Sequence, residues 1–312
     1  MTKRIQNKVA ESRFALTVVS VFAAIVWLAC GLLTQQWWAQ GVCLALSTFL
    51  VLILNNVNAL IRIYSRMVSC CFLLLSCMAC YLFEDMKGGI VQLCVVTSYL
   101  ALFHSYQDKQ AMGWVYYSFL CLGLASAVFV QILFYVPVLW LLTAIYLNAL
   151  SWRTFSASVL GLLTPYWFAT AWFVWEHDTT SLANHFAALG QFQSLVDFQQ
   201  LTASQWLVIG YVLILTTIGI VHFYRNSYQD KIRTRQLYGF MLVVYLFTVL
   251  LMALQPCYHG VLVRILIINA APFIAHFIAL THSKWTNITF WVAAIGCLLI
   301  TAFNVWMSSS IF

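Results

Sequence analysis

Long runs of apolar residues, divided by short polar stretches, are the main pattern along this chain. Uncharged runs of about 17 to 25 residues are typical of membrane-spanning helices, because a helix satisfies its own backbone hydrogen bonds inside hydrocarbon. The pattern predicts an all-α bundle of about eleven transmembrane helices, forming one domain over residues 1–312. The expected spans are residues 14–33, 41–54, 67–83, 90–103, 114–131, 132–150, 155–175, 206–224, 238–255, 261–280 and 285–306.

Helix boundaries are hardest to place within residues 114–150. Two short helices must share one apolar run here, and no charged residue marks the turn between them. One long kinked helix, or a re-entrant pair of helices, fits the same pattern.

Residues 176–205 form the longest segment between the predicted spans. Their apolar residues recur at a spacing of three to four, which is typical of one face of a helix. We predict an amphipathic helix that lies on the outer surface of the membrane or folds as a lid over the bundle. Thr202 and Gln205 then have the spacing of a capping box for the next span. The apolar residues are Leu182, Phe186, Leu189, Phe192, Val196 and Leu201.

The composition excludes a water-soluble protein of this size. Hydrophobic residues make up 63% of the chain and charged residues 7%, and the mean hydropathy is +0.91. So few polar residues cannot cover the surface of a 312-residue soluble protein. The chain must therefore be solvated by lipid.

Lysine and arginine are distributed unevenly between the two sides of the predicted bundle. A cytoplasmic N-terminus places thirteen of the fifteen basic residues in the cytoplasm, as the positive-inside rule requires, and the C-terminus outside. The net charge of +7 then follows from topology, and a nucleic-acid partner is not needed. Lys87 lies in an outer loop and Arg264 inside a span. The thirteen are Lys3, Arg4, Lys8, Arg13, Arg62, Arg66, Lys109, Arg153, Arg225, Lys231, Arg233, Arg235 and Lys284.

Arg264 is the main candidate for a binding residue, because a charge inside a span is costly and is a functional hypothesis by default. Its guanidinium, with His259, is suited to the phosphate or diphosphate of a lipid near the outer leaflet. Asn269, Pro272 and His276 share another face of the same helix, and Asn269 extends the candidate binding site. The structural alternative is that Arg264 reaches outward to lipid headgroups and that Pro272 only kinks the helix.

Acidic residues of the outer loops are the candidate catalytic groups. Glu84 and Asp85 lie between two spans, and Glu176 and Asp178 flank His177 at the start of the long outer segment. Paired carboxylates beside a histidine can act as general acid and base on a sugar hydroxyl, or bind a divalent cation. The alternative is that they are ordinary solvated loop residues.

Trp37 and Trp38 stand together near the outer end of a predicted span. Tryptophan at span ends usually anchors helices at the headgroup level. The alternative is a platform for stacking a sugar, which makes both residues candidates for binding.

The sequence carries no motif of a known cofactor or metal site. A Walker loop, a dinucleotide fingerprint, GxSxG and HExxH are all missing, and the ten cysteines lie in or beside spans without metal-ligand spacing. We therefore predict no metal, and the cofactor stays unknown. A remote alternative is a non-haem iron held by four histidines of comparable depth, as in membrane carotenoid-cleaving oxygenases. These are His104, His222, His276 and His282.

Residues 123–142, 151–168 and 268–291 resemble, in this order, a family of polytopic inner-membrane proteins of Bacteroidetes-type bacteria. That family has no agreed activity, so the resemblance implies a location in the bacterial inner membrane rather than a reaction.

A weaker likeness is to the membrane glycosyltransferases that use polyprenyl-phosphate sugars. The small residues 123–126, followed by an aromatic-proline step at residues 134–137, are similar to stretches in those enzymes. That resemblance implies an essential acid in the first outer loop. Residues 34–40 contain no carboxylate, so Glu84 or Asp85 would have to replace it.

The pentapeptide Ser-Tyr-Gln-Asp-Lys occurs twice, at residues 105–109 and 227–231. Both copies follow a predicted span on the cytoplasmic side. Their tyrosines are suited to anchoring at the interface, and Asp108 and Asp230 are suited to capping the next helix. A remnant internal repeat, or a shared docking surface, is the alternative.

The leading functional hypothesis is an inner-membrane protein of bacterial envelope biogenesis. It binds or processes a phosphate-bearing lipid, such as a polyprenyl-linked glycan, at the outer face, and any enzyme activity would be glycosyltransferase-like or lipid-modifying. The second hypothesis is a non-enzymatic subunit or scaffold with membrane-protein partners, and the third is a transporter. Transport ranks last because no pair of broken helices recurs in matching halves.

Overall fold

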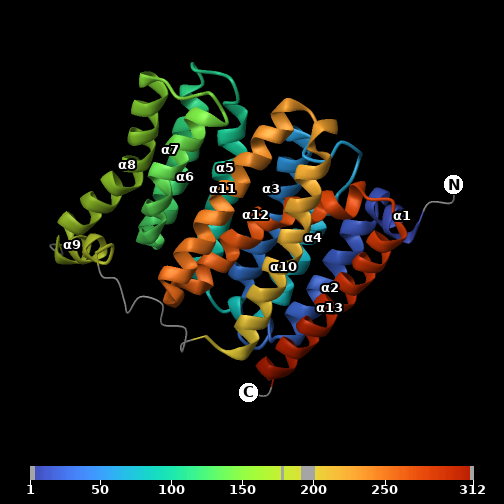
Figure 1. Cartoon of the computed structure of the whole chain (residues 1–312). Helices are drawn as coiled ribbons and strands as arrows, with labels where there is room; N and C mark the ends of the chain where they lie inside the picture. Colours follow the sequence, from blue (N-terminus) through green and yellow to red (C-terminus); the bar gives the residue numbers. More distant parts are fainter. Residues whose placement is uncertain (1–3, 177–178, 191–200, 310–312) are drawn as a thin grey trace.

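The computed structural model describes residues 4–176, 179–190 and 201–309, which form helices and no strand (Figure 1). The α-helices are α1 (Ile5–Glu11), α2 (Ala15–Ala29), α3 (Trp38–Asn58), α4 (Met67–Met78), α5 (Met86–His104), α6 (Met112–Val128), α7 (Tyr135–Ile145), α8 (Trp152–Trp175), α9 (Thr179–Ala187), α10 (Ala203–Asn226), α11 (Ile232–Leu254), α12 (His259–Leu280) and α13 (Lys284–Ser309). Short 3₁₀ turns, η1 (Cys80–Leu82), η2 (Val130–Phe134), η4 (Ser227–Gln229) and η5 (Pro256–Tyr258), join some of them.

Every apolar run identified in the sequence overlaps a helix of the structure, but residues 30–33 and 146–150 lie beyond the ends of α2 and α7. Seven helices in the described part of the chain are long and apolar enough to cross a membrane, or eight if α1 and α2, bent by 90°, make one span. α4, α6 and the stretch formed by η2 and α7 are apolar but shorter. These features are those of a multi-pass membrane protein, and the count of about eleven crossings stays a prediction.

The ambiguous stretch 114–150 is divided into two helices. Phe129 has an extended backbone conformation, with φ −140° and ψ 96°, and ends α6 before η2 and α7 begin. The Ser126 hydroxyl donates to the Gly123 carbonyl 2.8 Å away, a local bond that competes with continuation of the helix. One long kinked helix is therefore wrong.

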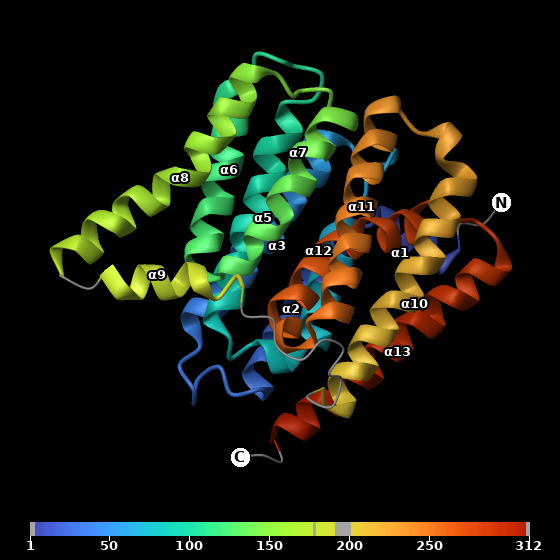
Figure 2. The same cartoon turned by 60° about the vertical axis from the view of Figure 1, so that its left-hand side comes forward.

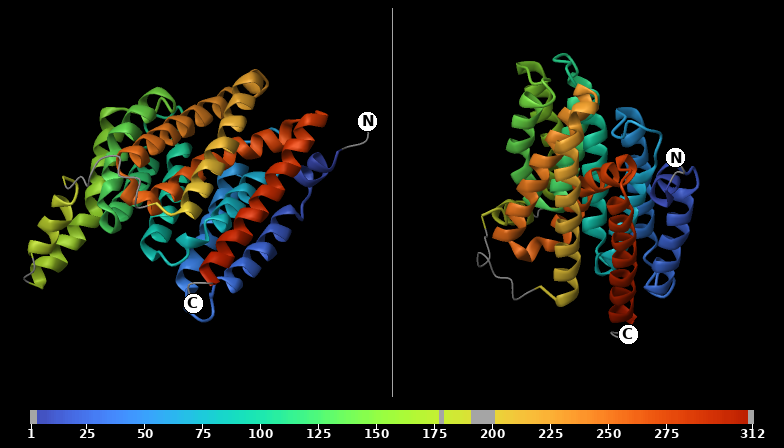
Figure 3. Two further views of the ribbon diagram at one scale, coloured as in Figure 1. Left: turned by 60° about the horizontal axis from the view of Figure 1, so that its bottom comes forward. Right: turned by 45° about the vertical axis from the view of Figure 1, so that its right-hand side comes forward.

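α12 is the central helix of the bundle. In its most apolar 18-residue stretch, 89% of the residues are buried inside the protein. The helices α4, α5, α10 and α11 pack around it. Because α12 is apolar on nearly every side, burial of its whole circumference is favourable. α6 and α8 lie at one edge of the bundle (Figure 2), and α13 lies beside α2 at another (Figure 3).

The two ends of the bundle differ in charge. α3, α5, α10 and α12 end at what we call the basic end, where the loops carry nearly all the lysines and arginines. α1 lies across this end, since the Gln6 amide donates to the Ile278 carbonyl at 2.7 Å and to the Thr281 hydroxyl at 2.6 Å. α5 and α12 begin at the opposite end.

The predicted amphipathic segment is described in part. α9 packs against α8, with the rings of Phe186 and Tyr166 5.0 Å apart, and His185 Nε2 lies 3.0 Å from the Ser126 carbonyl. Residues 191–200 lie outside the described residues, so a lid stays a prediction. The predicted capping contact is confirmed, because the Gln205 side-chain oxygen accepts from the Thr202 amide at 2.9 Å.

Candidate functional site

Arg264 lies on α12 near the opposite end of the bundle, with only 8% of its surface exposed. It does not reach outward to headgroups. Nη1 donates to Gln92 Oε1 at 3.1 Å, and Nη2 donates to the carbonyls of Leu82 and, at 3.0 Å, Asp85. The guanidinium therefore ties α12 to the turn between α4 and α5.

Asp85 is the N-cap of α5, and its carboxylate accepts from the Gly88 amide at 3.0 Å. A β-carbon at Gly88 would stand 2.7 Å from Arg264 Nε and overlap the Asp85 carboxylate. Both charged groups thus lie against the same glycine, and Asp85 is the strongest favourable charge acting on Arg264. Only glycine at position 88 leaves room for this arrangement. This requirement could not be seen in the sequence from Asp85 or Arg264.

Several buried donors around Arg264 have no protein partner. Arg264 Nε, Gln92 Nε2 and the Tyr81 hydroxyl lack a hydrogen bond, although each atom is shielded from solvent. Buried polar groups are normally paired, so such atoms call for an explanation, and a ligand is one explanation. Sequence reasoning missed Gln92 and Tyr81 because an uncharged polar residue within an apolar run gives little signal.

A small polar pocket adjoins Arg264. Its volume of about 10 Å³ accommodates roughly one water-sized atom. Five lining side chains can donate hydrogen bonds and none is acidic, so the pocket favours an electronegative oxygen over a cation. The lining residues are Trp27, Gln40, Leu44, Ser76, Leu82, Phe83, Gln92, Arg264 and Ile267.

An apolar groove of about 390 Å³ lies between α2 and α3 on the adjoining surface. Trp27 and Leu44 line both the groove and the polar pocket. The Trp27 ring stacks on that of Phe83 at 4.0 Å between centroids, and Phe83 also lines the polar pocket. Trp38 lines the groove and is 55% exposed, whereas Trp37 is half-buried at the N-cap of α3. Only one of the two candidate tryptophans therefore faces this space.

The other candidates on α12 are not ligands of the polar pocket. His259 begins the helix, with Nδ1 3.1 Å from the Pro256 carbonyl and its ring 6.4 Å from that of Tyr81. Asn269 is fully buried deeper in the bundle, where it accepts from the Tyr99 hydroxyl at 3.1 Å and donates to the Ile265 carbonyl.

The candidate acids are not brought together as one catalytic group. Glu84 is exposed, and its backbone carbonyl accepts from the Gln40 amide at 3.4 Å. Glu176 is exposed at the C-terminus of α8, on a different part of the bundle from α5. His177 and Asp178 lie outside the described residues.

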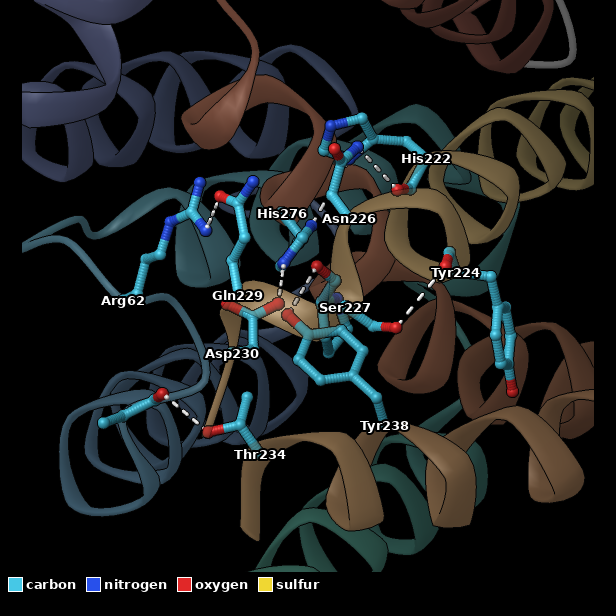
Figure 4. Close-up of polar contacts among 12 residues, drawn as sticks. Arg62, His222, Tyr224, Asn226, Ser227, Gln229, Asp230, Thr234, Tyr238 and His276 are labelled. Carbon is cyan, nitrogen blue, oxygen red and sulfur yellow. Dashed lines mark hydrogen bonds and ion pairs between the residues drawn. The ribbon is translucent and has the colours of Figure 1, made fainter. Parts of the chain in front are cut away.

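Of the four histidines of comparable depth, two are in contact. His222 and His276 have their Nδ1 atoms 3.4 Å apart at the basic end of the bundle (Figure 4). His104 instead stacks on Trp114, with ring centroids 4.5 Å apart, and His282 is exposed beyond the end of α12. Within the described ranges, no group of three or more histidine, cysteine, aspartate or glutamate side chains is placed to hold a metal ion.

Comparison with known proteins identifies no relative. No family model, no curated protein and no solved structure matches the chain.

Proposed function

We propose that the chain binds the phosphate-bearing head group of a lipid at the opposite end of the bundle. The observation that carries this proposal is the junction between a buried cationic pocket and an apolar groove, which share Trp27 and Leu44. A ligand that fills both must have an electronegative head and a hydrocarbon chain. One phosphate oxygen matches the size of the pocket and the unpaired donors of Arg264 and Gln92.

The expected setting is bacterial envelope biogenesis at the inner membrane, with the basic end of the bundle in the cytoplasm. The distribution of lysine and arginine supports this orientation. It places Arg264 near the outer leaflet, where polyprenyl-linked glycans are presented for assembly. Binding has more support than catalysis, because the nearest acid, Asp85, already caps α5.

The first test measures the lipid that stays bound to the purified protein. We expect about one phosphate-bearing lipid per chain by native mass spectrometry, and occupancy about tenfold lower in Arg264→Gln, the equivalent of roughly 1.4 kcal/mol. Arg153→Gln is the matched control, because Arg153 is exposed at the start of α8. Equal occupancy in all three proteins, or equal loss in both variants, would refute a site at Arg264.

A second variant tests the groove without touching the buried charge. Ala45 lines the groove and is exposed. Ala45→Phe should fill part of the space and lower lipid occupancy while leaving the thermal midpoint of unfolding unchanged. Retention of the lipid by a folded Ala45→Phe protein would show that the groove does not hold its chain.

A non-enzymatic subunit of an envelope complex is the second candidate function. Towards its C-terminus the α8 helix runs away from α6 (Figure 2), and three of its tryptophans are largely exposed. Such a helix is suited to packing against a partner within the membrane. We expect a partner to co-purify after gentle detergent extraction, and a monomer without one argues against this function. The tryptophans are Trp167, Trp172 and Trp175.

A further inference from the structure

A chain of three titratable side chains links α10, α12 and the loop before α11 (Figure 4). His276 is fully buried, and its Nε2 lies 3.0 Å from Asp230 Oδ2. On the other side of the ring, His276 Nδ1 lies 3.4 Å from His222 Nδ1. The Asp230 side chain is 2% exposed, and His222 is only partly buried. His222 is therefore the member that water reaches most easily.

Asp230 belongs to the second copy of Ser-Tyr-Gln-Asp-Lys, and capping is not its role. α11 has no side-chain cap, and the Asp230 carboxylate points to His276. Asp108 in the first copy does not cap α6 either, because the N-cap there is Ala111 without a side-chain bond. Its carboxylate accepts locally from the Gln110 amide at 2.8 Å. The two copies share a turn, since the aspartate amide donates to the serine carbonyl in each. They differ in what the carboxylate contacts.

Hydrogen-bond chemistry determines where the protons lie when Asp230 is ionised and both histidines are neutral. An ionised carboxylate only accepts, so His276 Nε2 carries a proton and donates it to Asp230. The Nδ1 atom of neutral His276 then accepts, and His222 Nδ1 must be the donor. His222 Nε2 is left with a free lone pair. Both contacts are satisfied by one tautomer of each ring.

The buried charge at Asp230 is only partly compensated in that state. Asp230 Oδ1 is buried without a hydrogen-bond partner. In the described part of the chain, no lysine or arginine stands within ion-pair distance of Asp230. Burying a carboxylate that has only one neutral hydrogen-bond donor costs free energy. One added proton would make the group of His222, His276 and Asp230 neutral overall.

Among the described residues, the side chains that face His222, His276 and Asp230 from neighbouring elements include no second acid. Arg62, in the loop after α3, acts on His222 and donates to Gln229 Oε1. The Tyr238 hydroxyl, from α11, donates to the Pro272 carbonyl at 3.2 Å. Cys71, from α4, lies near Tyr238.

We propose that His222, His276 and Asp230 form a proton-binding relay at the basic end of the bundle. A proton from water binds His222 Nε2, and the proton on His222 Nδ1 passes to His276 Nδ1. His222 is then neutral with its proton on Nε2. His276 is an imidazolium that donates to both His222 and Asp230. The numbers of protons and charges are conserved. Both hydrogen bonds persist, but the bond between the two histidines changes direction, because His276 Nδ1 now donates to His222 Nδ1.

Packing protects the middle of the relay from water. The rings of Phe223 and Tyr238 lie 5.1 and 5.5 Å from that of His276. Gly219, one turn before His222, lets α10 touch the α12 backbone, since a β-carbon there would stand 2.7 Å from the Phe273 carbonyl. The direct contact between the two helices keeps the histidine rings within hydrogen-bond range.

The relay is independent of the proposed lipid site. His276 follows Arg264 by twelve residues on α12, which is about 18 Å along a helix. It binds a proton at the basic end whether or not a lipid occupies the opposite end.

The test is solid-state NMR of the full chain in lipid nanodiscs, with histidine nitrogens labelled with ¹⁵N. Between about pH 8 and pH 5, the range in which histidines commonly titrate, His276 should gain a second N–H. At the same pH, the His222 proton should move from Nδ1 to Nε2. This coupled change of tautomer is the signature of a relay, and a purely structural contact would not produce it.

Two variants and a metal analysis complete the test. Asp230→Asn should abolish the coupled change over this range, whereas His282→Gln, an exposed control, should retain it. Independent titration of the two histidines in the unsubstituted protein, or no change of tautomer, would overturn the proposal without any variant. So would one zinc or iron ion per chain that is lost in His222→Gln, because the facing nitrogens would then be metal ligands.

Discussion

Replacement of Gly161 by leucine should separate α8 from α6 and destabilise the fold by about 3 kcal/mol or more, at the upper end for overpacking. A β-carbon at Gly161 would overlap the Tyr116 carbonyl and stand 3.0 Å from the Leu120 amide. Across the same interface, a β-carbon at Gly123 would stand 2.7 Å from the Leu162 carbonyl. Backbone atoms cannot rotate away as side chains do, so the helices must move apart. In lipid such close contacts are a main source of helix association.

The measurement is the thermal midpoint of unfolding of the purified protein in detergent. We expect a decrease on the order of 5 °C or more for Gly161→Leu. Gly113→Leu is the matched control, because Gly113 is exposed near the start of α6 and has no neighbour within 4 Å of a β-carbon. A Gly161→Leu protein as stable as Gly113→Leu would show that the close contact of α6 and α8 contributes little.

Gly219→Leu should have an effect of similar size at the centre of the bundle. A β-carbon there would meet the Phe273 carbonyl carbon and oxygen at 2.7 Å and the Ile274 amide at 3.0 Å. The added side chain would push α10 off the most buried helix, again with a cost of about 3 kcal/mol or more. Gly210, on the same helix, has no such neighbour, so Gly210→Leu should leave the thermal midpoint nearly unchanged.

The same variant bears on the proton relay, because Gly219 and His222 lie on one face of α10. Separation of α10 from α12 should lengthen the His222–His276 contact and weaken the coupled change of tautomer. Any Gly219→Leu protein that stays folded can be examined by the same NMR titration. An unchanged thermal midpoint for Gly219→Leu would contradict the close backbone approach on which this reasoning rests.

For Arg264, the charge pattern predicted its position inside an apolar helix but not its hydrogen-bond partners. An arginine inside an apolar run is visible in the sequence, and the structure places it on a helix long and apolar enough to cross a membrane. Its partners could not be predicted, because two of them are carbonyls of Leu82 and Asp85, and every residue has a carbonyl. Gln92 lies far from Arg264 along the chain, and only the packing of α5 against α12 brings the two together.

Asp230 and Asp108 show the same limit in the repeated pentapeptide. Identical local sequences produce the same short-range bond between aspartate amide and serine carbonyl. The carboxylates then differ, since a fully buried histidine lies beside Asp230 whereas Asp108 bonds locally. A local pattern determines local hydrogen bonds, and the three-dimensional neighbours decide the chemistry.

The amino-acid sequence alone was sufficient to locate most of the helices and to indicate that several are apolar enough to cross a membrane. Hydropathy measures the preference of each segment for water or hydrocarbon, and this preference is a property of the segment itself. Tertiary structure decided that α12 is central, that Gly123, Gly161 and Gly219 are contact points, and that His222 and His276 meet while His104 lies elsewhere. Lipid is as apolar as the helices, so hydropathy does not choose among helix pairs. Shape and hydrogen bonding make that choice, and both depend on residues far apart in the sequence.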